Sequence, residues 1–124
     1  MIKQLTGATI WSENLNNLLP FYRDVLGLKV VDESPEAGFA YLVAGSPDAP
    51  GLGLGTHSEV HGPNRDPHRH MVGFETDDIA ADVKRLKEAG VEFIEEPTDY
   101  GEMRIATLKD PEGNLIQLFQ ISTQ

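Results

Sequence analysis

The sequence contains no cysteine in its 124 residues, which excludes thiolate catalysis, disulfides and thiolate-ligated metals. This absence agrees with a reducing cytoplasm. Basic residues are also scarce, with 10 Lys and Arg against 20 Asp and Glu and a formal net charge of -10. Because nucleic-acid binding depends on clustered Lys and Arg at phosphates, we expect no nucleic-acid partner.

Long hydrophobic runs are missing as well. No apolar stretch approaches the roughly 18 residues of a membrane span. The first residues, Met1–Gln4, lead directly into a strand pattern without a signal peptide. We therefore expect a cytoplasmic protein with no membrane partner. With 40% hydrophobic residues, the chain can bury the core of a single domain, residues 1–124.

The most informative stretch closes the chain. Asp110–Asn114 reads Asp-Pro-Glu-Gly-Asn, which predicts a tight turn, because Pro presets φ and Gly accepts a positive φ. A strand follows in which Leu115, Gln117, Phe119 and Ile121 share one face. Gln117 is then a polar group in an apolar row. Because an unpaired buried amide costs roughly 1–3 kcal/mol, we expect it to bind a protein group, water, ligand or metal.

The chain reads as two similar halves. The first half predicts a strand at 5–11, a helix ending at Gly27 that Pro20 bends or confines to the segment around it, and strands at 28–33, 38–44 and 52–56. The second half predicts a strand at 70–75, a helix from Asp77 or Asp78 to Gly90, and strands at 91–95, 103–108 and 114–121. We place module 1 at about 1–58, a linker at about 59–68 and module 2 at about 69–124.

An internal repeat supports this division. Gly27 to Gly90, Val30 to Phe93 and Trp11 to Phe74 each span 63 positions. One helix on one face of a sheet leaves the other face open, so the two sheets are expected to curl toward a shared cleft, within one chain or across a dimer. The predicted fold class is α+β, with two tandem βαβββ modules whose mixed sheets form an open, barrel-like cleft.

Three stretches carry a family resemblance: Phe21–Leu28, His70–Glu75 with its following helix and Ala89–Val91, and Asp110–Phe119. They resemble the vicinal oxygen chelate superfamily, which includes glyoxalase I, extradiol dioxygenases, fosfomycin-resistance enzymes and bleomycin-binding resistance proteins. The resemblance covers nearly the whole chain and implies paired βαβββ modules, usually in a homodimer, with the site in the concavity of the sheets.

The resemblance also implies where a metal would be held. Metal-dependent members use a His on the first strand, a His or carboxylate ending the first module, a His opening the second module and a Glu on the last strand. Those places correspond here to Gly7, a position within Gly53–Gly55, His70 and Gln117. One imidazole and one amide do not make the usual set of about three ligands. We therefore predict no cofactor, with His70 and Gln117 as the candidate ligands if a metal is bound.

Strand alternation predicts the remaining site. If His70 and Gln117 face inward, apolar and hydrogen-bonding side chains join them, which suits a small organic ligand better than a metal-chelating one. The predicted ligand-binding residues are Thr9, Trp11, His70, Phe74, Met103, Ile105, Thr107, Gln117 and Phe119. For Trp11 and Phe74, plain core packing is the competing interpretation.

The four histidines, His57, His61, His68 and His70, fall close together and offer a separate hypothesis, an independent zinc site. Three functional interpretations follow from the sequence. The first is a metal-independent protein that binds a small organic ligand. The second is a lyase, isomerase or dioxygenase-type enzyme acting on a small oxygenated metabolite. The third is a regulatory or accessory module whose cleft is vestigial.

Overall fold

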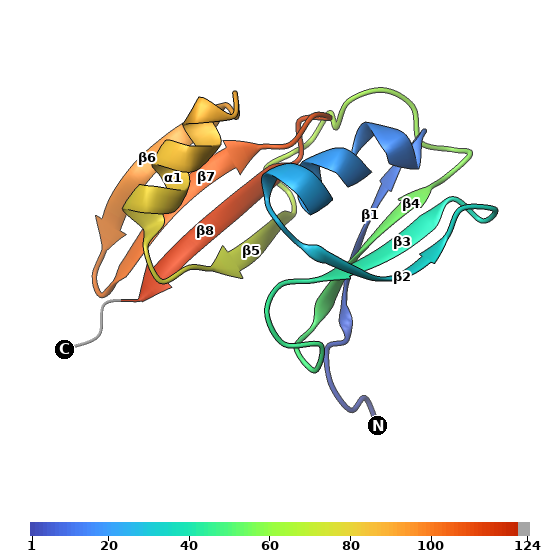
Figure 1. The fold of residues 1–124 in the computed structure, drawn as a ribbon, viewed down its shortest axis with the longest axis horizontal. Coiled ribbons are helices and arrows are strands. Elements are labelled where there is room, and N and C mark those ends of the chain that lie inside the picture. The colour runs from blue at the N-terminus through green and yellow to red at the C-terminus, as the bar shows by residue number, and fades with distance from the viewer. Residues whose placement is uncertain (122–124) are drawn as a thin grey trace. The chain divides into compact units, whose positions relative to one another are not determined.

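The computed structural model describes residues 1–121, which form an α+β structure of two four-stranded mixed sheets (Figure 1). The chain divides into two compact units, Met1–Gly62 and Pro63–Gln124, here called unit 1 and unit 2. Within residues 1–121, no helix is long and apolar enough to cross a membrane. The predicted pair of βαβββ modules is confirmed by the order of the elements.

Unit 1 contains one sheet with the strand order β1-β4-β3-β2. Its elements are β1 (Gly7–Ser12), η1 (Leu15–Asn17), η2 (Phe21–Val25), β2 (Lys29–Ser34), β3 (Phe39–Val43) and β4 (Gly51–Thr56). β1 pairs with β4 in parallel, and the other two pairs are antiparallel. One face carries Ala40, Leu42, Leu52 and Leu54, all buried, and it forms the core with Leu18 and Tyr22.

The helical segment of unit 1 is divided into two short turns on either side of Pro20, the residue at which the sequence predicts a bent or confined helix. η1 is a 3₁₀ turn and η2 is a π-helical turn that begins directly after Pro20. Proline lacks the N–H of a regular helix and clashes with the preceding turn, which prevents one continuous α-helix. The segment ends at Gly27, whose φ of 83° is in the left-handed region that glycine readily adopts.

Unit 2 repeats the order with a regular helix. Its elements are β5 (Met71–Glu75), α1 (Ile79–Glu88), β6 (Phe93–Tyr100), β7 (Met103–Lys109) and β8 (Leu115–Ile121), in a sheet of order β5-β8-β7-β6. α1 packs against β6, β7 and β8 through the predicted residues Ile79, Val83 and Leu86, all buried. Asp78 caps the helix by accepting the N–H of Ala81 at 3.1 Å.

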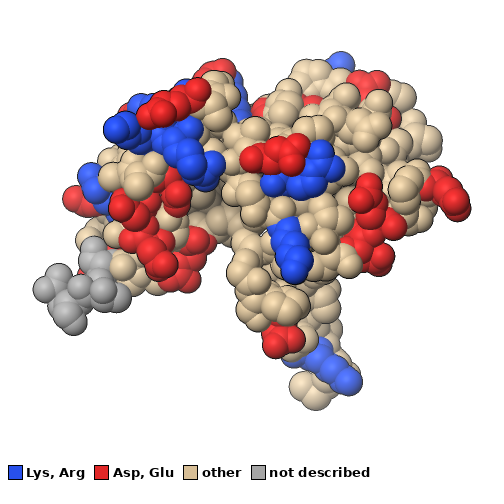
Figure 2. Space-filling model, viewed as in Figure 1, with Lys and Arg blue, Asp and Glu red and all other residues tan. Residues whose placement is uncertain are grey.

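Ion pairs cover the outer side of α1. Acidic and basic side chains intermix around this helix in Figure 2. Arg85 pairs with Asp82, and Lys87 pairs with Glu96 of β6. The Lys87 ammonium also lies 5.9 Å from the centroid of the Phe93 ring. These exposed pairs contribute little to stability, and they keep the outer face of α1 solvated.

The predicted turn at Asp110–Asn114 is formed by a buried carboxylate. Asp110 is 5% exposed and accepts the N–H of Glu112 at 2.8 Å, the N–H of Asn114 at 2.9 Å and the Asn114 amide at 2.8 Å. Asn64 joins this turn to the stretch before β5, since its side chain donates to the Asn114 oxygen at 2.8 Å. The turn therefore fixes the register between β7 and β8.

Strand pairing corrects one landmark of the repeat. Ile10 pairs with Leu54 in unit 1, and Phe74 pairs with Leu118 in the same way in unit 2. The equivalent of Phe74 is therefore Ile10 and not Trp11, so the proposed match of Trp11 with Phe74 is wrong by one residue. A shift of one residue moves every side chain of a strand to the opposite face.

Candidate functional site

The open face of the unit 1 sheet is a row of glycines covered by aromatic rings. Gly51, Gly53 and Gly55 occupy alternate positions of β4, and a Cβ on each of them would collide with a neighbouring side chain. At Gly55 the added atom would lie 2.4 Å from the Trp11 ring, and at Gly51 it would lie 2.4 Å from the Tyr41 ring. The absent side chains allow the rings to lie directly on the sheet backbone.

Two aromatic side chains of this face differ in their freedom. The Tyr41 hydroxyl accepts the N–H of Gly51 at 2.9 Å and donates to the carbonyl of Thr6 at 3.2 Å, which fixes the ring. Trp11 lies 6.3 Å from the Phe39 ring and 5.4 Å from the His57 ring, yet remains 45% exposed. An aromatic ring that packs on the sheet backbone with one face and exposes part of its surface can stack with a planar molecule.

The open face of the unit 2 sheet collects most of the other predicted residues. Pairing between β7 and β8 places Thr107 beside Gln117, Ile105 beside Phe119 and Met103 beside Ile121, as the alternation predicts. Gln117 is half-buried, and no group within residues 1–121 forms a hydrogen bond with its amide. The role of these residues in binding stays a prediction.

Two predicted residues lie elsewhere. Phe74 pairs with Leu118 and therefore lies on the face that α1 covers, so its predicted inward position is wrong. His70 precedes β5 and is exposed. Met71, which pairs with Leu115, is the residue that shares the face of Gln117 at this end of β5. The cause is the one-residue error in aligning the first strands of the two modules.

A polar row crosses the unit 2 sheet, and the sequence analysis recovered only part of it. Glu95 of β6 pairs with Thr107, which pairs with Gln117. The Tyr100 hydroxyl donates a hydrogen bond to the Glu95 carboxylate, which raises the pKa of Tyr100 above its ordinary value. Glu95 was missed because two bulges in β6 shift the simple alternation.

A pattern in the sequence could have predicted the aromatic residues Phe39 and Tyr41 of unit 1. Gly51-Leu52-Gly53-Leu54-Gly55 alternates strictly between glycine and leucine, which predicts one buried face and one face without side chains. Because side chains alternate along the neighbouring strand β3, Phe39 and Tyr41 lie on this same glycine face. The pattern was interpreted only as a strand, and the room it leaves for aromatic rings was overlooked.

The residues at the family's metal positions do not fit a divalent metal. Gly7 and the glycines and leucines of β4 offer no donor side chain, while His70 and Gln117 offer one imidazole and one neutral amide, and His70 is exposed ahead of β5. Such a set falls short of the roughly three imidazole and carboxylate ligands that zinc and similar ions need. In the part of the chain that the structure describes, no three His, Asp or Glu side chains are grouped to hold a metal ion, and the histidine hypothesis gains no support.

Comparison with protein families gives a match over residues 4–118 to the model of the Glyoxalase/Bleomycin resistance protein/Dioxygenase superfamily. The chain belongs to this superfamily. YurT of Bacillus subtilis is 32% identical over 121 residues, covering 91% of this chain and 95% of YurT. CFP32 of Mycobacterium tuberculosis is 33% identical over 124 residues, covering 96% of this chain. The chain spans only 46% of CFP32, whose name proposes a glyoxylase.

Solved structures agree on the fold. TnmS3 from Streptomyces sp. CB03234, described as an antibiotic binding protein, superposes with a TM-score of 0.78 at 24% identity over 98% of each chain. A superfamily member from Sphaerobacter thermophilus superposes with a TM-score of 0.77 at 25% identity, over 97% of this chain and 98% of the other. The glyoxalase-like fold is thus shown by family membership and by structure.

Proposed function

We propose that this protein binds a small, planar organic molecule without the divalent metal of its enzymatic relatives. The observation that carries the proposal is Trp11, which rests on the bare backbone of Gly55 and is 45% exposed. Stacking on a supported ring contributes roughly 0.5–1.5 kcal/mol beyond the burial of apolar area. Trp11, Phe39 and Tyr41 together offer such a surface on unit 1.

The relatives support a binding role. TnmS3 is described as an antibiotic binding protein, and it has the same fold with a similar length. The superfamily also contains enzymes, and the name of CFP32 proposes a glyoxylase. We favour binding over the lyase, isomerase or dioxygenase alternative because the metal positions hold Gly7 and Gln117, whose side chains do not provide the ligands that such chemistry uses.

The test is a thermal-shift screen of small aromatic compounds on protein treated with a chelator. We expect compounds that raise the melting temperature and quench the fluorescence of Trp11, the single tryptophan. Trp11→Ala is expected to weaken their binding about tenfold, measured by calorimetry. Val31→Ala, which alters another exposed apolar residue of unit 1, is the matched control and should leave binding unchanged.

Two outcomes would contradict the proposal. Binding that appears only after a divalent metal is added would favour the enzymatic alternative. A screen in which no compound shifts melting or quenches Trp11 would favour the vestigial module.

A homodimer and a cytoplasmic location belong to the same proposal. The strands β1 and β2 at the edges of the unit 1 sheet, and β5 and β6 at the edges of the unit 2 sheet, each have one side without a strand partner within their own sheet. Such edges are commonly covered by a second copy. Light scattering at micromolar concentrations is expected to give twice the mass of 13.6 kDa. The monomer mass would contradict the dimer.

A further inference from the structure

The open face of unit 2 carries a row of polar side chains that the packing of the unit does not use. Glu95, Thr107 and Gln117 are neighbours on β6, β7 and β8, and adjacent strands lie roughly 4.8 Å apart. Apolar side chains flank the row on the same face, with Leu115 on one side and Ile105 and Phe119 on the other. A polar row within an apolar face suits the recognition of a ligand that is itself partly polar.

Thr107 shows that the row has unused hydrogen-bonding capacity. It is only 4% exposed, and no group within residues 1–121 bonds its hydroxyl. No fully buried polar side-chain atom in those residues lacks a partner, so the small exposed area of Thr107 includes its hydroxyl. The Gln117 amide beside it also has no partner in the described residues.

The charge on this face is negative. Glu95 lies at one edge of the row, and Glu75 of β5 pairs with Phe119 of β8 on the same face. Among the strand residues of this face, Lys109 is the only basic one, and its ammonium pairs with Glu92 at 3.2 Å. Arg104 pairs with Gln120 and therefore belongs to the face that α1 covers, where its guanidinium pairs with Asp99.

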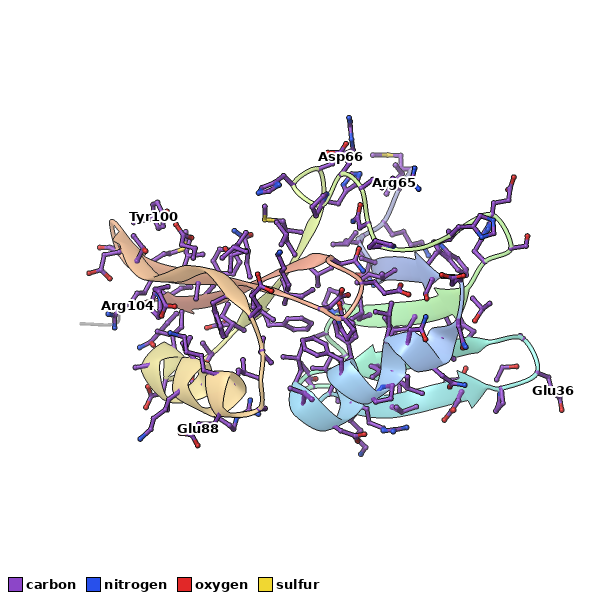
Figure 3. All side chains as sticks on the ribbon, turned by 90° about the horizontal axis from the view of Figure 1, so that it is seen from above. Glu36, Arg65, Asp66, Glu88, Tyr100 and Arg104 are labelled. Carbon is purple, nitrogen blue, oxygen red and sulfur yellow. The ribbon has the colours of Figure 1, made fainter. Side chains whose placement is uncertain are left out.

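One oxygen of the Glu95 carboxylate is engaged and the other is available. The Tyr100 hydroxyl donates to Oε2, and no second partner of this carboxylate lies within residues 1–121. Figure 3 shows Tyr100 at the tip of the β6–β7 hairpin, on the side of the sheet away from α1. Tyr100 therefore holds the carboxylate in place on the open face.

We propose that this face recognises a cationic nitrogen group, a primary ammonium or a guanidinium, on an organic ligand through Glu95, Thr107 and Gln117. All three side chains accept hydrogen bonds, and such groups carry several donors and a positive charge. A ligand carboxylate at the same place would face Glu95 and Glu75 with no free cation on the face. The inference rests on the proposed function, binding of a small organic molecule, and it names the chemical group that the open face of unit 2 would recognise.

The experiment is an NMR titration of ¹⁵N-labelled protein with three probes that share one ring system: naphthylmethylamine, naphthylmethanol and naphthoate. We expect the amine to shift the Gln117 side-chain amide signals and to bind about fivefold to tenfold more tightly than the alcohol, with naphthoate weakest. Glu95→Gln is expected to remove the preference for the amine over the alcohol. Thr107→Val is expected to weaken the binding of the amine, while the ¹⁵N spectrum still shows a folded unit.

The matched control is Glu88→Gln, which makes the same charge change at the end of α1, on the covered side of the sheet (Figure 3). It should leave the preference intact. Equal binding of amine and alcohol, tighter binding of naphthoate, or a preference that survives Glu95→Gln would each overturn the inference.

The design separates this inference from the proposed function. If aromatic compounds bind in the thermal-shift screen but the amine gains nothing over the alcohol, only the inference fails. If the screen and all three probes give no binding, the proposed function fails and the inference fails with it.

Discussion

The two units share one strand order but differ in what lies on the open face of each sheet. Unit 1 presents Trp11, Phe39 and Tyr41 on a row of glycines, and its helical segment is broken at Pro20. Unit 2 presents Thr107 and Gln117 within a polar row and packs a regular helix, α1, on its other face. The same topology therefore supplies one aromatic surface and one hydrogen-bonding surface, and a duplicated module need not duplicate its chemistry.

The covered faces of the two sheets, by contrast, are expected to lose similar stability when one of their buried leucines is replaced. Leu42 and Leu108 occupy equivalent positions on β3 and β7, and both are fully buried. Replacing either with alanine removes buried methyl groups and leaves a cavity, so each substitution should lower the free energy of unfolding by about 2–5 kcal/mol. Urea denaturation measures both. If only one of the two substitutions lowered the free energy of unfolding by less than about 1 kcal/mol, the two cores would not be equivalent.

The turns before the last strands should differ. Asp110 accepts at least three hydrogen bonds within its own turn, whereas in unit 1 the Ser46 hydroxyl accepts one from the N–H of Asp48 at 3.1 Å. We expect Asp110→Ala to cost about 2–4 kcal/mol and Ser46→Ala about 0.5–1 kcal/mol, because Asp110 is buried and charged. Thermal and urea unfolding of the two variants test this. Equal costs would contradict the stronger role of the unit 2 turn.

The glycines under aromatic rings offer a comparison of the open faces. A Cβ at Gly55 would lie 2.4 Å from Trp11, and one at Gly73 would lie 2.6 Å from Phe119. Gly55→Ala and Gly73→Ala should each cost about 1–3 kcal/mol, because a ring must move. Only Gly55→Ala should shift the fluorescence maximum of Trp11. An unchanged emission spectrum in Gly55→Ala would show that the ring does not rest on β4.

Strand β8 carries one glutamine on each of its faces, so the two residues can be compared directly. Gln120 accepts the N–H of Ile79 at 2.7 Å at the start of α1, whereas Gln117 has no partner within residues 1–121. Gln120→Ala should therefore cost about 1–2 kcal/mol of folding free energy. Gln117→Ala should change stability by less than about 0.5 kcal/mol and weaken ligand binding about tenfold. A larger stability loss at Gln117 would favour a structural role and a vestigial site.

The smallest expected effect concerns Tyr100. Its hydrogen bond to Glu95 raises the pKa of Tyr100 above the ordinary 10.0. The contribution to stability is therefore fully present below the unfolded-state pKa and is lost as pH rises through the higher folded-state value. The difference in melting temperature between wild type and Tyr100→Phe should disappear in that alkaline range. Ultraviolet titration should show the Tyr100 pKa falling in Glu95→Gln, and no change would contradict the contact.

Most of the fold could be predicted because hydrophobic periodicity and turn residues specify it directly. The buried positions of α1, the cap at Asp78 and the left-handed Gly27 and Gly90 all follow from local patterns. The faces of β5 could not be assigned in this way. Val72 and Gly73 are both small, so alternation alone does not show which of them faces the helix. A shift of one position replaces the predicted His70 and Phe74 by Met71 and Glu75 on the open face.

The candidate site was harder to predict than the fold because it depends on pairing between strands. Gln117 and Thr107 follow from alternation, but Glu95 joins them only through the bulges of β6. Likewise, nothing local to Trp11 indicates that Gly55 lies beneath it, since the two residues meet through the parallel pairing of β1 with β4. Such contacts are set by register rather than by local sequence.

The central claim is that the open face of unit 1 binds a small organic molecule and that the protein needs no family metal for this binding. The most direct test is a crystal structure of chelator-treated protein with the tightest compound from the screen, including anomalous scattering data. We predict ligand density stacked on Trp11 and no metal peak beside Gln117. A metal bound at His70 and Gln117, or a compound that does not contact Trp11, would contradict the account.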